Sequence, residues 1–210
     1  MLERIVDILN KDVLFDVSAT TTPDSSVLVV REDGEFSEIK ELTIKEIPDD
    51  SIAFTLDFSS KKNAKENGAL FSQLSPYFDK SNGDGINKSC DLVLITRVGD
   101  KFTVLIFDQK SKKPDIDSSF LQLENSRIFI SYMINIISLV YKANVNEGNL
   151  IFKRVIGTTR VVKTGVNAAN HEQERLRREK LRNLGMNEVS IKRTASIEKG
   201  WLDYRGIVSF

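Results

Sequence analysis

Two apolar stretches, Cys90–Ile95 and Phe102–Phe107, constrain the fold of this chain more than any other feature, because Gly99-Asp100 lies midway between them. A glycine followed by one other residue is typical of the type II′ turn that connects two antiparallel strands. Such a turn fixes the register, so that facing residues have numbers that add up to 199. Both strands are apolar on both faces, which predicts the centre of a sheet that is covered by helices on either side.

The open end of this predicted hairpin is polar. Asp91 faces Asp108, and Lys110 lies on the same side because side chains alternate along a strand. Facing like charges destabilise a strand pair, and buried carboxylates without partners are costly. A magnesium ion would remove this conflict, since it binds one or two carboxylates and keeps water or phosphate oxygens as its other ligands. In a simpler interpretation, Asp108 pairs with Lys110 and Asp91 remains in solvent.

Asp91 is followed, after 16 intervening residues, by Asp108-Gln109-Lys110. This spacing resembles the motif of the PD-(D/E)xK, or restriction-endonuclease-like, nuclease superfamily, with Cys90 in place of the proline. The resemblance covers about residues 60–157. It implies a nuclease in which Asp91 and Asp108 bind Mg²⁺ or Mn²⁺ and Lys110 acts on the attacking water. It also implies DNA rather than RNA as the substrate, and it does not distinguish an endonuclease from an exonuclease.

The same resemblance points to two further residues. Members of the superfamily often take a metal-binding glutamate from the helix before the hairpin, and Glu66 is the acidic residue of the segment 61–78. Glu66 is therefore implied as a metal ligand, although a solvated charge among lysines is an equal alternative. Gln122 is implied to face the site from the next helix and to assist catalysis. Its position three residues after Ser119 also matches a capping box, which would give it a role at the helix start.

The expected fold is α/β, with a restriction-endonuclease-like core in which helices flank a central mixed sheet. This core is assigned to residues 61–210, and a β-rich N-terminal extension, residues 1–60, is expected to pack on it. Within the core we expect three elements after the hairpin, which are a helix from about Asp117, a strand over Leu150–Ile156 and a charged helix over residues 171–182.

The extension is predicted to contain two hairpins. The first pairs Val27–Arg31 with Phe36–Ile39, and the second pairs Leu42–Ile47 with Ile52–Phe58. Because no strand is evident directly before Cys90, the segment Ile52–Phe58 is also a candidate for the first strand of the core.

The charge balance limits the range of partners. Lysine and arginine together number 30, as do aspartate and glutamate, so the net charge is zero and no overall basic footprint for nucleic acid exists. Residues 171–182 include five basic residues, which would supply a local positive surface, although such helices are commonly only solvated. The alternative to an enzyme is therefore a catalytically inactive nuclease-fold module that binds nucleic acid or protein.

Composition excludes some other classes. The single cysteine, Cys90, excludes an internal disulfide and fits a reducing compartment, and no signal peptide is evident, so a cytoplasmic location is expected. His171 is the sole histidine, and no nucleophile-elbow pattern accompanies it. The longest apolar run, Ile128–Tyr141, is too short to span a bilayer, so no membrane partner is expected. A homodimer contact is compatible with the helix that contains this run.

Overall fold

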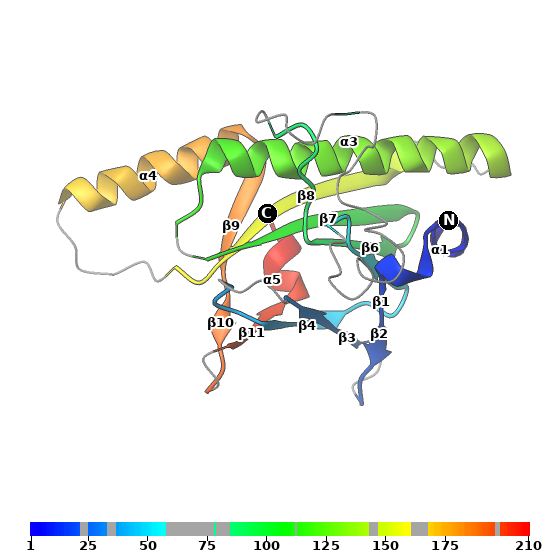
Figure 1. The fold of residues 1–210 in the computed structure, drawn as a ribbon, viewed down its shortest axis with the longest axis horizontal. Helices are drawn as coiled ribbons and strands as arrows, with labels where there is room; N and C mark the ends of the chain where they lie inside the picture. Colours follow the sequence, from blue (N-terminus) through cyan, green and yellow to red (C-terminus); the bar gives the residue numbers. More distant parts are fainter. Residues whose placement is uncertain are drawn as a thin grey trace.

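A computed structural model of the chain describes residues 1–21, 25–32, 37–57, 78, 85–111, 113–142, 147–160, 168–195 and 198–210. Its strands form two sheets (Figure 1). The larger sheet contains, in spatial order, β1 (Leu14–Phe15), β5 (Ser51–Phe54), β6 (Leu92–Val98), β7 (Lys101–Lys110), β8 (Leu150–Thr158) and β9 (Met186–Ser190). The smaller sheet contains β10 (Lys192–Arg193), β11 (Lys199–Asp203), β4 (Glu41–Ile47), β3 (Ser26–Arg31) and β2 (Val17–Ala19).

The central hairpin has the register that the sequence predicts. Strands β6 and β7 are antiparallel, with Leu92 facing Phe107 and Val98 facing Lys101. Gly99 adopts a φ of 62°, the left-handed conformation that the first residue of a type II′ turn requires. The turn chemistry alone was therefore sufficient to set the alignment of these two strands.

The elements around the hairpin give the larger sheet its mixed character. Strand β5 pairs antiparallel with β6, and β8 pairs parallel with β7 after the long helix α3 (Ile116–Tyr141). Helix α4 (Ala168–Asn183) then leads to β9, which is parallel to β8. The α/β class, the mixed sheet and the strand that begins at Leu150 are thereby confirmed. The segment considered for the first core strand does pair with the hairpin, through β5.

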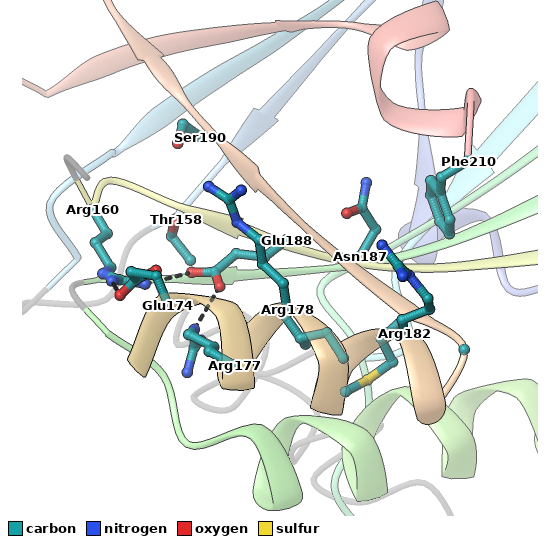
Figure 2. Close-up of a pocket in the computed structure, with 13 residues that line it drawn as sticks. Thr158, Arg160, Glu174, Arg177, Arg178, Arg182, Asn187, Glu188, Ser190 and Phe210 are labelled. Carbon is teal, nitrogen blue, oxygen red and sulfur yellow. Dashed lines mark hydrogen bonds and ion pairs between the residues drawn. The ribbon is translucent and has the colours of Figure 1, made fainter. Parts of the chain in front are cut away.

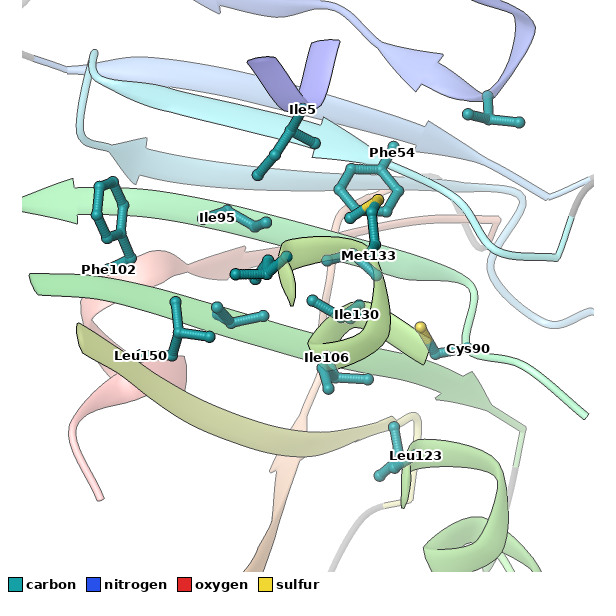
Figure 3. Close-up of a cluster of buried hydrophobic side chains, with 14 of the residues drawn as sticks. Ile5, Phe54, Cys90, Ile95, Phe102, Ile106, Leu123, Ile130, Met133 and Leu150 are labelled. Atoms are coloured by element: carbon teal, nitrogen blue, oxygen red, sulfur yellow. The ribbon is translucent and has the colours of Figure 1, made fainter. Parts of the chain in front are cut away.

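The larger sheet buries both of its faces. One face packs against α1 (Leu2–Ile8) and α3, where Ile5, Ile95, Ile130 and Met133 belong to one apolar cluster (Figure 3). The opposite face packs against the smaller sheet and the short helix α5 (Tyr204–Val208). Helices were expected on both sides: α1 and α3 cover one face, and the short α5 contributes only a part of the other. The apolar sides of β3, β4 and β11 cover most of the other.

Both predicted N-terminal hairpins are wrong. Strand β3 pairs with β4 and not with Phe36–Ile39, whose described part contains no strand. Strands β4 and β5 follow each other in the chain but belong to different sheets. Each strand pairs where its apolar side becomes buried, and that requirement outweighs the short connections on which the predicted hairpins were based.

The two sheets do not divide the chain at residue 60. Strands β1 and β5, from the first 60 residues, lie in the larger sheet, whereas β10 and β11 complete the smaller one. Strand β11 pairs parallel with β4, so that Lys199 faces Glu41. The N-terminal and C-terminal parts of the chain thus build the smaller sheet together.

Helix α3 keeps a partly exposed apolar side. Ile128, Tyr132 and Leu139 are 54%, 62% and 76% exposed. The apolar side chains of this helix are therefore not all covered, and dimerisation through them stays a prediction. Among the described residues, no helix combines the length and the apolar character needed to cross a membrane.

Candidate active site

Asp91, Asp108 and Lys110 meet on the α3 side of the larger sheet. Val93 and Ile106 belong to the apolar cluster beneath α3, and the alternation along each strand places all three polar side chains on that side. The backbone N–H of Gln109 donates a hydrogen bond of 2.6 Å to Oδ2 of Asp91, which holds Asp91 at the end of β7. The structure thus brings together the residues that the hairpin register predicted.

The Asp108 carboxylate is completely buried and has two polar neighbours. Its Oδ2 lies 2.7 Å from Nζ of Lys110, and its Oδ1 accepts a hydrogen bond of 2.8 Å from Nε2 of Gln122. Nζ of Lys110 also donates to Oε1 of Gln122 at 3.1 Å. The ion pair of the simpler interpretation therefore exists, but Asp91 is only partly exposed and lies beside it. The Lys110 side chain is 32% exposed, which leaves the cluster open to solvent on one side.

The charges of this cluster are not balanced. Burial raises the pKa of Asp91 well above its ordinary value of 3.8, and the neighbouring charge of Asp108 raises it further. Burial also raises the pKa of Asp108, although the Lys110 ammonium opposes the shift. One ammonium thus offsets only part of the penalty of burying two carboxylates. An additional cation would stabilise their charged forms.

Gln122 reaches the site because α3 is anchored to the chain that precedes Asp91. Its Nε2 also donates to the carbonyl of Ser89 at 2.5 Å, and the N–H of Cys90 donates to Oγ of Ser126 at 2.9 Å. Asn125, on the same helix, donates to the carbonyl of Gly85 at 3.0 Å. Gln122 therefore holds Lys110 and Asp108 in place as a positioning residue.

The capping-box interpretation of Gln122 is wrong. Asp115 is the N-cap of α3, and its Oδ2 accepts a hydrogen bond of 2.8 Å from the N–H of Ser118. Ser119 lies within the helix and donates to the carbonyl of Asp115. An aspartate accepts N–H groups at a helix start as well as a serine does, so the helix begins before the serine on which the interpretation rested.

The cluster fits a divalent cation through its two carboxylates. Oδ2 of Asp108 is buried and lies 2.7 Å from Nζ of Lys110, and the carboxylate of Asp91 lies beside it. Magnesium and manganese take such hard oxygen ligands. Within the described ranges, no three acidic, histidine or cysteine side chains converge closely enough to bind a metal. Glu66 lies outside the residues that the structure describes.

Asp57 is a nearby carboxylate that the motif does not contain. It follows β5, and burial raises its pKa, with Glu32 adding to the shift and Lys110 opposing it. The charge of Asp57 in turn contributes to the raised pKa of Asp108. The sequence offered only a partial signal, the candidate strand Ile52–Phe58, and the antiparallel pairing of β5 with β6 is what brings the residues after β5 towards Asp91.

The comparisons with known proteins do not add to this geometry. No family model matches the chain, and neither a curated protein nor a solved structure is significantly similar to it.

Proposed function

We propose that this protein is a metal-dependent nuclease of the PD-(D/E)xK type that hydrolyses phosphodiester bonds, with DNA as its substrate. The observation that carries the proposal is that Asp91 and Asp108 lie side by side at the end of the central hairpin, in an unbalanced cluster with one lysine. Two like charges buried side by side lower the free energy of unfolding, and a metal ion bound between them would offset that loss.

The order of the elements gives further support. Asp91 precedes β6, the triplet Asp108-Gln109-Lys110 ends β7, and α3 and the parallel strand β8 follow. The resemblance implies this same succession of hairpin, helix and strand. Gln122 extends from α3 to Asp108 and Lys110, which is the placement that the resemblance implies for a polar residue of this helix.

Each side chain of the cluster has a distinct role in the proposed reaction. Asp91 and Asp108 hold Mg²⁺ or Mn²⁺, which when bound polarises a phosphodiester and lowers the pKa of bound water. Lys110 orients the attacking water or neutralises charge that develops on the phosphate. Gln122 fixes the Lys110 ammonium through its Oε1 and the Asp108 carboxylate through its Nε2.

The test is cleavage of labelled single-stranded and double-stranded DNA and RNA in Mn²⁺, with metal binding measured separately by calorimetry. Asp91→Ala and Asp108→Ala should lose both properties. Lys110→Ala should bind the metal and lose about 10²–10⁴-fold in rate, which is the usual contribution of a positioned proton-transfer group. Lys113→Ala, at an exposed lysine on the same segment, is the matched control and should cut at the wild-type rate.

Two results would contradict the proposal. A Lys110→Ala variant that cuts as fast as the wild type would remove the lysine from the mechanism. A wild-type protein that binds the ion but cuts none of the four substrates would favour the alternative, a nuclease-fold module that binds nucleic acid or protein. The absence of a three-residue metal group among the described residues is the observation on which that alternative rests.

A further inference from the structure

A pocket of about 500 Å³ lies between α4 and the strands β8 and β9 (Figure 2). Its size is within the range of pockets that hold small ligands or parts of larger ones. Four arginines and two glutamates line it, so its charge is positive although the whole chain is neutral. The composition of the wall favours an anion.

The charges on the inner wall are paired with each other. Arg160 forms ion pairs with Glu174 and Glu188, and Nε of Arg177 donates to Glu188 at 2.7 Å. Nη2 of Arg177 is buried and has no hydrogen-bond partner among the described residues. The two glutamates thus neutralise this wall, and one buried donor remains for an acceptor from outside.

The outer wall carries the excess charge. Arg178 and Arg182 lie four residues apart on α4, so their side chains share one side of the helix. Both are exposed, and within the described part of the chain neither side chain forms an ion pair or hydrogen bond. Two guanidinium groups without counterions are suited to phosphate oxygens, which they bind in a bidentate manner.

An aromatic ring and an amide complete the pocket. Phe210 is 45% exposed, with Nζ of Lys153 4.5 Å from the centre of its ring, and Asn187 is half-buried. Figure 2 shows Phe210 and Asn187 near Arg182 at one end of the pocket. Basic side chains that contact the backbone, combined with an aromatic ring on which a base stacks, are typical of surfaces that bind single-stranded nucleic acid. An amide can also bind the edge of an unstacked base.

The pocket is adjacent to the carboxylate cluster. Thr158, which lines the pocket, is the register partner of Lys110 in the parallel pair of β7 and β8. Ser190, another lining residue, faces Thr158 on β9. Neighbouring strands are about 5 Å apart. The pocket therefore begins one strand away from Lys110, at the same end of the parallel strands.

We infer that this pocket holds one nucleotide of the nucleic-acid strand on which the candidate active site acts. Arg178 and Arg182 bind its phosphate, and Phe210 stacks on its base. The inference rests on the proposed nuclease function, because the short path from Thr158 to Lys110 is what places the adjoining phosphodiester bond beside the carboxylates. The pocket thereby selects a strand whose bases are unpaired.

The test is fluorescence anisotropy of labelled single-stranded DNA and RNA oligonucleotides with the full chain in EDTA, where a metal-dependent nuclease does not cut. The Arg178→Ala/Arg182→Ala double variant should bind at least tenfold more weakly. The slope of log affinity against log salt should fall by about 1.4, since each contact with a single-strand phosphate contributes about 0.7. Phe210→Ala should weaken binding about fivefold or more, as loss of a stacking aromatic does.

Arg175→Ala is the matched control, because Arg175 is on the same helix but pairs with Glu172 and does not line the pocket. It should bind within twofold of the wild type. Equal affinities of the double variant and the wild type would overturn the inference, as would a wild-type protein that binds no oligonucleotide. A pocket that binds only inorganic phosphate or a free mononucleotide, each added as a competitor, would overturn it as well.

Cleavage in Mn²⁺ separates this inference from the proposed function. If the wild type binds strands through the two arginines but cuts none, the assignment of the pocket is supported and the proposed nuclease activity is contradicted. If the double variant binds and cuts as the wild type does, the proposed nuclease activity is supported and the assignment of the pocket is contradicted.

Discussion

Two clusters of charged side chains lie on the same face of the larger sheet, and they differ in how their charges are balanced. In the carboxylate cluster (Asp91, Asp108, Lys110 and Gln122), one ammonium faces two carboxylates, and the pKa of each carboxyl is raised. In the arginine–glutamate network (Arg160, Glu174, Arg177 and Glu188), each carboxylate contacts a guanidinium. The guanidinium groups compensate the carboxylates of the network, whereas protons or an added cation would stabilise the carboxylate cluster.

This difference shows how two clusters of charged side chains on one face of a sheet can serve different purposes. A balanced buried network loses stability when any partner is removed, because a charge then remains without compensation. An unbalanced cluster gains stability when one of its excess charges is removed or bound. The sign of the response to a substitution therefore distinguishes a structural cluster from one that is prepared for a ligand.

The largest effect is expected from Glu188→Ala. Arg177, whose side chain is 7% exposed, would lose its ion-pair partner and retain a buried charge, so the free energy of unfolding should fall by about 3 kcal/mol. Urea denaturation monitored by circular dichroism would measure it. Asp108→Asn should not destabilise the metal-free protein at pH 7, and losses of equal size in both variants would remove the distinction between the clusters.

The next effect is the response to metal. Mn²⁺ at 100 times its dissociation constant should raise the free energy of unfolding of the wild type by about 2.7 kcal/mol, through binding to the folded state alone. Asp91→Asn and Asp108→Asn should abolish this gain, and Glu188→Ala should keep it despite its lower stability. A wild-type melting temperature that does not change up to millimolar Mn²⁺ would leave the carboxylate cluster without its proposed ligand.

A smaller effect is expected from pH in the absence of metal. Because the folded-state pKa of Asp91 and Asp108 is raised above the ordinary value of 3.8, the folded protein retains protons that the unfolded chain has released. This contribution to stability is complete below that value and is lost as the pH rises through the raised pKa. The loss is about 1.4 kcal/mol per pH unit for each retained proton.

Urea midpoints of the wild type and an Asp91→Asn/Asp108→Asn double variant from pH 4 to pH 8 would measure this dependence. The double variant should lose it, apart from the part due to Asp57, whose pKa is also raised. Parallel curves for the two proteins would mean that the carboxylates are not destabilised by burial.

The smallest effect is expected on the exposed side of α4. Glu172 and Arg175 form an ion pair at 2.7 Å with side chains that are 54% and 63% exposed. Solvent screens such pairs, so Glu172→Ala should leave the urea midpoint close to that of the wild type. The same urea series provides the measurement, and a loss close to that of Glu188→Ala would show that burial does not explain the larger value.

Much of the candidate site was predictable from the sequence because it depends on local rules. The Gly99 turn fixed the register of the hairpin, and the alternation along β6 and β7 then placed Asp91, Asp108 and Lys110 on one face. The helix and the strand after the motif follow from apolar periodicity and length. The sequence left two roles open for Gln122, and the contact with Asp108 supports the one at the site.

The remaining features depend on contacts between segments that are distant in the sequence. The parallel pairing of β11 with β4 brings together residues near both ends of the chain, and the pocket depends on α4, β8 and β9 meeting beside Phe210. No turn or period within a segment specifies such a pairing, because it is selected by which apolar faces can be buried at the same time. The sequence by itself determined the central hairpin and the face that carries its charged residues. The tertiary structure decided which strands complete the sheets and which charges acquire partners.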